Sequence, residues 1–472
     1  MERATAMAIP AGRASGARAV LRWLRPLDNG PQEIRALDGL RAIAALSVVA
    51  FHTISGSQIE AVTPGLNPSV FWNYLRSGVH LFFVLSGFLL FMPYARAMLR
   101  GRPLPSARQF YRRRALRILP AYWVCLAVLV LLSLPVYLSA SGAPNVLLHI
   151  ALVHNFVPQY DMGIQGVFWT MAVEAQFYVL LPGLAWLLSK LVGDSRSLGR
   201  LLAGVVGLAL AFVLIRELVG VLDVGTAPRP GWLSALLIGL NSSQGHFLET
   251  FATGMFCGTL YVAQQEGRLR RGVRQTAVQG ARQSSSQGVR NSPLRPSLAW
   301  IGTAMVAGGL LLAWWLAEGV AANRTGITNA CYACLNPGNQ ESVAGPLLIG
   351  VSYSAMVLGT LWGAGAVRWL FELAPLRFVG LISYSLYLWH LPLLQATEQH
   401  VGGLAPWLRL ALIAGTAFVA ALPLAYLSYQ FVERPFLKLR HRGSADKPAS
   451  LPIAVERRTD SPQELAAPVP RG

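Results

Sequence analysis

Long apolar runs alternate with short polar segments along most of the chain. An apolar run of about 20 residues is long enough for an α-helix to cross the hydrocarbon core of a bilayer. The pattern predicts an all-α fold, a polytopic bundle of about ten transmembrane helices. A further run at 144–157 is too short to span and predicts an interfacial or re-entrant piece. The predicted spans lie at about 37–55, 77–95, 117–139, 167–191, 198–222, 246–264, 298–318, 344–367, 378–397 and 406–431.

Basic residues gather in every second loop between these runs. Such an alternation predicts that the basic loops face the cytoplasm, together with both the N- and the C-terminus. The outer loop 140–166 contains no Lys or Arg. The formal net charge of +19 would point to a nucleic-acid partner in a soluble chain. Here only 13% of the residues are charged and 54% are hydrophobic, so the basic residues are better explained as topology signals.

Composition divides the chain into one spanning domain and polar flanks. Residues 1–34 are Arg-rich and lack the apolar core of a signal peptide, which predicts a disordered cytoplasmic arm. Residues 35–440 carry the predicted spans. The inner loop 265–297 is rich in Gly, Ser and Gln and is predicted to be disordered, as is the polar tail 441–472.

The stretch from Arg35 to Ser55, RALDGLRAIAALSVVAFHTIS, is apolar enough to span yet carries Asp38, Arg41 and His52. A charge at bilayer depth costs roughly 3 to more than 10 kcal/mol, so it usually serves a function. Arg41 and His52 are eleven residues apart, which places them on nearly the same helix face, separated by roughly 16 Å along the axis. One face thus offers a cation near the inner side and an imidazole near the outer side. Asp38 is expected to pair with Arg41 at i, i+3.

Two further ionisable groups are predicted in the outer half of the membrane. Glu174 lies about 10 Å below the outer face in the fourth span, and His390 lies at a similar depth in the ninth. Three groups at matched depth on different helices favour a site in which His52 acts as general base and Glu174 orients it or is itself the base. Alternatively, a His–Glu pair only joins two helices, and His390 only satisfies the helix broken by Pro392.

The inner end of the third span, YRRRALRILPAYW, is strongly basic. Arg114 and Arg117 share a face at i, i+3, and Arg41 reaches the same side of the membrane. Arginine forks suit phosphate groups. The alternative is that these arginines only touch lipid headgroups, and it is strongest for Arg112 and Arg113.

The remaining candidate groups carry weaker signals. Ser86 and Gly87 in GVHLFFVLSGFLLF permit close approach between helices or to a ligand, but no Gly-x-Ser-x-Gly elbow surrounds the serine. Cys331 and Cys334 fall in an outer loop and predict a local disulfide rather than a redox or metal site. No metal is expected.

Six segments, taken in order, resemble the acyltransferase 3 family of integral membrane acyltransferases. They are LDGLRAIAALSVVAFH, GVHLFFVLSGFLL, RRRALRILPAYW, WTMAVEAQFYVLLP, ISYSLYLWHLPL and FVERP, and they cover the chain from about 35 to 437. The resemblance implies ten spans, an acyl-CoA donor on the cytoplasmic side, and acyl transfer to a hydroxyl, commonly at the outer face.

The resemblance also implies roles for particular residues. The family's Arg-x10-His pattern falls on Arg41 and His52, its Arg-x-x-Arg on Arg114 and Arg117, its Ser-Gly-Phe-Leu on Ser86 to Leu89, and its first glutamate on Glu174. The chain departs from many members at His80, where an acid is common, and at Ala175, where a second Glu often follows the first. These departures shift weight to Glu174.

Together these observations predict an O-acyltransferase of a bacterial inner membrane. Arg41, Arg114, Arg117 and Ser86 would bind acyl-CoA, with acetyl as the expected group, and His52, Glu174 and His390 would carry the chemistry. The acceptor would be a hydroxyl of a glycan or another small molecule, reached directly or through a covalent acyl intermediate. An extracytoplasmic partner protein is possible, and no nucleic acid is expected. The competing hypotheses are a transporter or flippase and a scaffold without activity.

Overall fold

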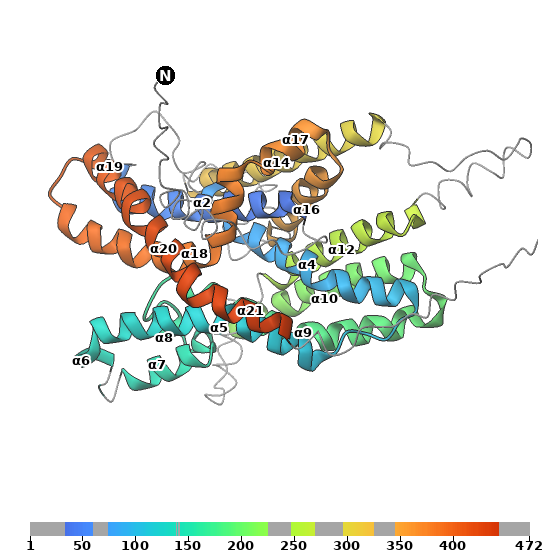
Figure 1. The fold of residues 1–472 in the computed structure, drawn as a ribbon, viewed down its shortest axis with the longest axis horizontal. Coiled ribbons are helices and arrows are strands. Elements are labelled where there is room, and N and C mark those ends of the chain that lie inside the picture. The colour runs from blue at the N-terminus through green and yellow to red at the C-terminus, as the bar shows by residue number, and fades with distance from the viewer. Residues whose placement is uncertain are drawn as a thin grey trace, which may run out of the picture.

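The computed structural model describes residues 34–59, 74–224 apart from positions 138, 140 and 141, 247–269, 296–324 and 345–442. All regular structure within these ranges is helical. Most of the long helices run side by side along a common direction (Figure 1). The long helices are α2 (Arg35–Ser57), α4 (Gly78–Arg100), α5 (Ala107–Leu132), α9 (Phe168–Val192), α10 (Leu198–Val224), α12 (Leu248–Gln265), α14 (Pro296–Arg324), α16 (Gly345–Trp362) and α18 (Ala374–Val401).

Several short elements connect the long helices or complete the last span. They are α6 (Leu134–Tyr137), α7 (Ala143–Ile150), η2 (His154–Phe156), α8 (Pro158–Asp161), η3 (Gly193–Ser195), α17 (Gly365–Phe371), α19 (Pro406–Thr416), η5 (Ala417–Ala421), α20 (Leu422–Ser428), η6 (Tyr429–Glu433) and α21 (Arg434–Arg442).

Eight helices in the described ranges are long and apolar enough to cross a membrane. They confirm that the chain is an integral, multi-pass membrane protein with an all-helical fold. The count of ten spans and the cytoplasmic termini stay predictions. The eight are Arg35–Ser57, Tyr74–Arg100, Ala107–Leu132, Phe168–Ser195, Leu198–Val219, Ala299–Ala317, Gly345–Trp362 and Pro406–Leu439.

The other two predicted spans correspond to α12 and α18, which are long helices with many inward-facing polar groups. α12 buries Glu249 and Thr250, and α18 buries Ser385 and His390. These side chains lower the average hydropathy of both helices. Polar groups inside a membrane usually face the bundle interior, where they find partners or line a site.

Two glycines allow α4 and α12 to pack at very short range. A Cβ added to Gly87 would lie 2.1 Å from the carbonyl oxygen of Phe251, and one added to Gly254 would lie 2.2 Å from that of Val84. No side chain fits at either position without moving a backbone. This is the close approach predicted for the Ser86–Gly87 pair, and its partner is α12.

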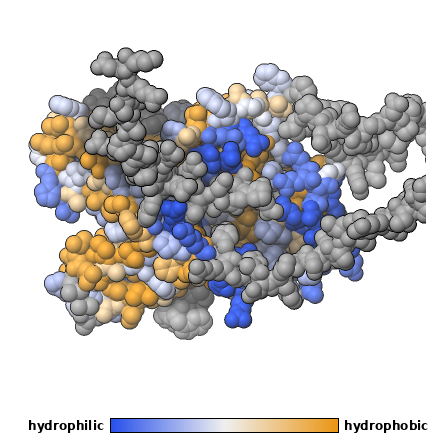
Figure 2. Space-filling model, viewed as in Figure 1, coloured by the Kyte–Doolittle hydropathy of each residue, from blue (hydrophilic) through white to orange (hydrophobic). Residues whose placement is uncertain are grey.

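The outer surface of the bundle is apolar, as a lipid-facing surface must be. Figure 2 shows apolar side chains gathered over α5 to α8 at one end of the molecule and over α19. Leu132 of α5 is 76% exposed and Val419 of η5 is 79% exposed, values that would be costly in water. The exposed side chains of the spans therefore fit contact with acyl chains rather than with solvent.

The last span is interrupted by two π-helical turns, η5 and η6. Each such turn accommodates one extra residue within an α-helix, and π-turns are frequent at functional sites. Glu433, at the end of η6, is fully buried. The second π-turn thus ends on a carboxylate inside the bundle.

The apolar run at 144–157 forms no spanning helix, as predicted. It contains α7 and η2, which bring the rings of His149 and His154 into a parallel stack with 3.8 Å between centroids. Both histidines are fully buried. Burial lowers the pKa of His149 to about 4 and that of His154 to about 3.

The segments predicted to be disordered, 1–34, 265–297 and 441–472, lie almost entirely outside the described residues. The same holds for Cys331 and Cys334, so their predicted disulfide stays a prediction.

Candidate active site

The two predicted intramembrane histidines contact each other. His52 extends from α2 and His390 from α18, two helices that pack side by side. Nε2 of His390 lies 3.2 Å from Nδ1 of His52, and the ring centroids are 5.1 Å apart. His390 is fully buried, whereas His52 is half-buried and lines a cavity of about 860 Å³.

Backbone carbonyls define which ring nitrogens carry protons in this pair. Nδ1 of His52 lies 3.0 Å from the carbonyl oxygen of Val48, and Nδ1 of His390 lies 3.1 Å from that of Leu386. A carbonyl oxygen only accepts, so each neutral ring carries its proton on Nδ1. Nδ1–H of His52 is then shared between two acceptors, the carbonyl oxygen of Val48 and Nε2 of His390. Nε2 of His52 remains unprotonated, which is the state that a general base needs.

The helix break at Pro392 lies close to His390. A proline at 392 leaves the carbonyl of Leu388 without its usual helical donor. The thiol of Cys125, on α5, donates to that carbonyl at 3.6 Å. His390 bonds the carbonyl of Leu386 on its own helix and also contacts His52, so its role in the chemistry stays a prediction.

Glu174 occupies a different place from the one predicted. The Ser86 hydroxyl donates to Oε1 of Glu174 at 2.7 Å, and the Tyr178 hydroxyl donates to the same oxygen. Neither bond involves His52, whose ring partner is His390. This corrects the expectation that Glu174 orients His52. Sequence spacing gives the depth of a group along its own helix but not the rotation of that helix against its neighbours.

Glu174 instead lies in a smaller cavity, of about 120 Å³, together with the three arginines. Arg41, Arg114 and Arg117 come from α2 and α5 and line it. Ser86 and Tyr178 are also in its wall. The structure thus brings the predicted donor-binding residues together around one space.

The three arginines differ in how they are held. Arg41 pairs with Asp38 at 3.2 Å, as predicted, and about a third of its side chain is exposed. Arg117 pairs with Glu433 at 2.9 Å. The guanidinium of Arg114 lies 5.9 Å from the centre of the Tyr178 ring, and its buried Nε has no hydrogen-bond partner. Arg114 is therefore the arginine with unused donor capacity.

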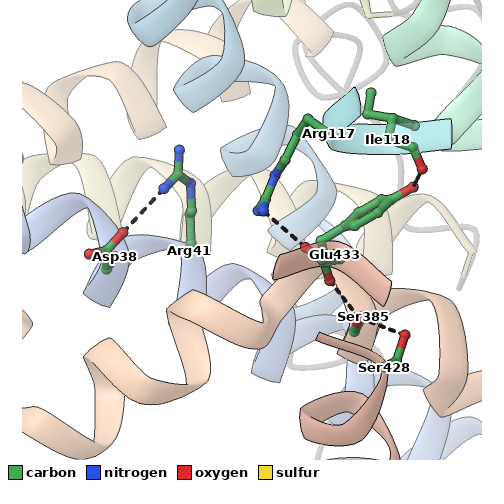
Figure 3. Close-up of polar contacts among 8 residues, drawn as sticks. Asp38, Arg41, Arg117, Ile118, Ser385, Ser428 and Glu433 are labelled. Carbon is green, nitrogen blue, oxygen red and sulfur yellow. Dashed lines mark hydrogen bonds and ion pairs between the residues drawn. The ribbon is translucent and has the colours of Figure 1, made fainter. Parts of the chain in front are cut away.

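Glu433 is a site residue that sequence reasoning missed. Figure 3 shows its carboxylate between Arg117 and Ser385, whose hydroxyl also lies 3.0 Å from that of Ser428. The segment FVERP contains it, but nothing in the spacing of the motif points to a partner nearly 320 residues earlier. A carboxylate at the inner end of a span that faces a basic loop was the available signal.

The two cavities adjoin each other. Val79 and Tyr387 line both of them. The hydroxyls of Tyr387 and Thr170 lie 2.9 Å apart at this junction. The cavity lined by the arginines and Glu174 and the larger cavity lined by His52 thus share part of one wall.

The larger cavity is lined by several residues that the sequence did not predict to lie together. His80, one of the departures from the family pattern, lies in its wall, with its ring 5.3 Å from that of Phe247. Trp169 stands 5.0 Å from Phe247 on the same side. His390 lines neither cavity. It contacts the His52 ring through its Nε2.

Comparison with known proteins finds relatives over most of the chain. The chain is 23% identical to peptidoglycan O-acetyltransferase OatA of Listeria monocytogenes over 430 residues, which are 86% of this chain and 56% of OatA. It is 32% identical to nodulation protein 10 of Rhizobium leguminosarum over 31% of this chain and 42% of that protein. The chain thus spans about half the length of these two relatives.

A third relative and a family-wide match complete the comparison. Protein 2 in the picA locus of Rhizobium radiobacter is 28% identical over 34% of this chain and 74% of that protein. No solved structure matches the chain. The model of the acyltransferase 3 family, described as an acyltransferase domain, matches residues 34–429, and so most of the helical bundle. The chain therefore belongs to the acyltransferase 3 family.

Proposed function

We propose that this protein moves an acyl group, acetyl being the expected one, from cytoplasmic acyl-CoA to a hydroxyl of a glycan at the opposite face of a bacterial inner membrane. The observation that carries the proposal is the pair of adjoining cavities, with arginines at one end and an unprotonated His52 nitrogen at the other. Adjoining cavities of this kind let donor and acceptor meet without either crossing the membrane.

The donor end is assigned to the three arginines. Their guanidinium groups offer several N–H donors to phosphate oxygens. Glu433 pairs with Arg117 and Asp38 pairs with Arg41, so Arg114 supplies most of the unpaired positive charge. The smaller cavity, which these arginines line, is narrow. It suits the extended arm of acyl-CoA that carries the acyl group better than it suits the bulky nucleotide. Ser86 and Glu174 line the path that this arm would follow.

The chemistry is assigned to His52. Nε2 of His52 takes the proton of the acceptor hydroxyl as its oxygen attacks the thioester carbonyl carbon. The carbon–sulfur bond then breaks, and the leaving thiolate receives the proton from His52, so that an ester and a free thiol result. A positioned base of this kind contributes typically about 10² to 10⁴-fold in rate. Nε2 of His390 accepts from Nδ1–H of His52 and stabilises the imidazolium that forms, much as the carboxylate does in a catalytic triad.

The deciding experiment measures thioester cleavage by the purified full-length chain in lipid nanodiscs. Wild-type protein and a His52→Ala variant are compared with acetyl-CoA as donor and with a His400→Ala variant as control. His400 lies at the exposed outer end of α18. We expect wild type and the control to cleave acetyl-CoA and His52→Ala to lose most of this activity. Equal turnover by His52→Ala would contradict the assignment. Substrate movement without thioester cleavage would support the transporter hypothesis instead.

A further inference from the structure

The larger cavity contains a carboxylate that the proposed chemistry does not use. Glu398, on the last turn of α18, lies in its wall, as does Gly56 of α2. A Cβ added to Gly56 would lie 1.9 Å from Oε1 of Glu398, so the carboxylate rests directly on the α2 backbone. An alanine at position 56 would force the Glu398 side chain to move away.

The position of this contact relates Glu398 to the reacting nitrogen. Gly56 follows His52 by four residues on the same helix, which is about one turn and a rise of about 6 Å. The carboxylate of Glu398 therefore lies about one helical turn outward from His52. One turn is close to the width of a single sugar ring.

No described residue that lines the cavity pairs with the carboxylate of Glu398. This residue has no ion pair or hydrogen bond with any residue in the described ranges. The guanidinium of Arg409, which lines the same cavity, is held elsewhere by the carbonyls of Gly402 and Leu404 and by Oε1 of Gln58. Its carboxylate lines the cavity without a protein donor, so it can accept a hydrogen bond from a hydroxyl or ammonium group of a ligand.

A second carboxylate and an aromatic wall complete this space. Asp161, at the end of α8, lines the cavity, and its Oδ1 is buried with no hydrogen-bond partner. Trp169 and Phe247 lie in the wall of the cavity and offer flat apolar surfaces. Carboxylates for hydroxyl or ammonium groups together with aromatic rings for C–H faces are the combination that suits a sugar.

We infer that Glu398, held on Gly56, binds the acceptor by accepting a hydrogen bond from a hydroxyl or ammonium group on the sugar ring that carries the reacting hydroxyl. Trp169 and Phe247 pack against the apolar face of that ring. The inference rests on the proposed function and extends it, since it assigns the residue that holds the acceptor sugar and selects its orientation. Glu398 touches the acceptor but takes no part in proton transfer.

The test uses the full-length chain in nanodiscs with acetyl-CoA and two acceptors of different charge. Chitotriose offers hydroxyls only, and its fully de-N-acetylated counterpart adds ammonium groups. Glu398→Ala removes the carboxylate, and Gly56→Ala displaces it without changing its chemistry. Glu372→Gln is the matched control, because Glu372 pairs with Arg368 on α17 and lines neither cavity. Acceptor KM, kcat and acetyl-CoA hydrolysis without acceptor are measured for each.

We expect Glu398→Ala and Gly56→Ala to raise the acceptor KM by about tenfold or more, as for loss of a hydrogen bond to a charged group. Hydrolysis without acceptor is expected to be unchanged in both, and Glu372→Gln to match wild type throughout. Glu398→Gln distinguishes the two donors: it keeps affinity for chitotriose if a hydroxyl is bound, and loses affinity for the amino sugar if an ammonium is bound.

Two results would overturn the inference. An acceptor KM that stays at the wild-type value in both Glu398→Ala and Gly56→Ala would remove Glu398 from the acceptor site. Acetyl-CoA cleavage by wild type without transfer to either sugar would exclude the assigned class. Absence of acetyl-CoA cleavage by wild type is a different failure, which contradicts the proposed function itself.

Discussion

Nε2 of His390 lies 3.2 Å from Nδ1 of His52, so a second histidine occupies the place that a carboxylate takes in most catalytic triads. A neutral imidazole stabilises a neighbouring imidazolium by accepting its hydrogen bond, without adding a charge to the membrane interior. This suits a site at bilayer depth, where an extra carboxylate would itself need a partner.

Replacing His390 is expected to lower kcat more than it changes KM. His390→Ala removes the acceptor that orients His52, and we expect kcat to fall roughly tenfold to a hundredfold, as for other groups that orient a reacting side chain. His390→Gln offers a carbonyl oxygen and should recover part of the loss. Steady-state kinetics with acetyl-CoA test this. A rise in donor KM at unchanged kcat would show that His390 serves binding instead.

Removing Glu433 alone is expected to destabilise the bundle strongly. Glu433 is fully buried against Arg117, and loss of one partner of a buried pair costs about 3–5 kcal/mol. Glu433→Leu should therefore lower the thermal unfolding temperature clearly. The double variant Arg117→Met, Glu433→Leu should recover most of the stability, because no unpaired charge remains. Melting curves of wild type, Glu433→Leu, Arg117→Met and the double variant in one detergent give the coupling energy. Additive losses would mean that the pair is not coupled.

Arg114 is expected to carry more of the donor affinity than its neighbour in the sequence. The Nε of Arg114 is buried without an acceptor, whereas Arg113 is exposed. Arg114→Ala should weaken acetyl-CoA binding by about tenfold, as for a lost charge-assisted hydrogen bond, and Arg113→Ala should not. Isothermal titration in nanodiscs measures both. If both variants weakened acetyl-CoA binding equally, the effect would come from the surface charge and not from a specific contact of Arg114.

Acid is expected to destabilise the helical segment formed by α7 and η2 through His149 and His154. Their pKa values in the fold are lowered to about 4 and about 3, below about 6.5 in an unfolded chain. Unfolding then takes up protons, so the free energy of unfolding falls as the pH drops from about 6.5 through about 4. Above pH 6.5 both states are neutral and no effect is expected.

The matched variant for this pH dependence is His154→Phe, which keeps a ring in the stack but removes one titrating group. Its melting temperature should fall less than that of wild type between pH 7.5 and pH 5. His400→Gln removes an exposed histidine and should leave the pH dependence unchanged. Parallel curves for His154→Phe and wild type would contradict the assignment.

The sequence predicted those parts of the site that depend on a single helix. Asp38 and Arg41 pair at i, i+3 because both lie on α2, and His52 reaches its cavity from the same helix. Contacts between helices were not accessible in this way. The pairing of His52 with His390 depends on how α2 and α18 are rotated against each other, which no spacing within either helix reveals.

Two of the predicted spans, α12 and α18, have a lower mean hydropathy than the others, and contacts between helices explain this as well. α12 and α18 are polar on the faces that they bury, so their composition underestimates how deeply they lie in the bundle. Glu174 illustrates the converse. Its depth was predicted from the fourth span, but Tyr178, one turn further along the same helix, and Ser86 of α4 decide which cavity it enters.

The π-turn at Tyr429–Glu433 sets the angular register of the chain's last helical segment. One extra residue in a turn rotates everything beyond it by about 100° around the helix axis. Deleting a single residue within η6 would keep the span long and apolar enough for the membrane, yet turn the following residues to another side. Glu433 would no longer face Arg117, and a carboxylate now buried in protein would be presented to lipid. In this protein, helical phase determines the final span as much as hydrophobic length does.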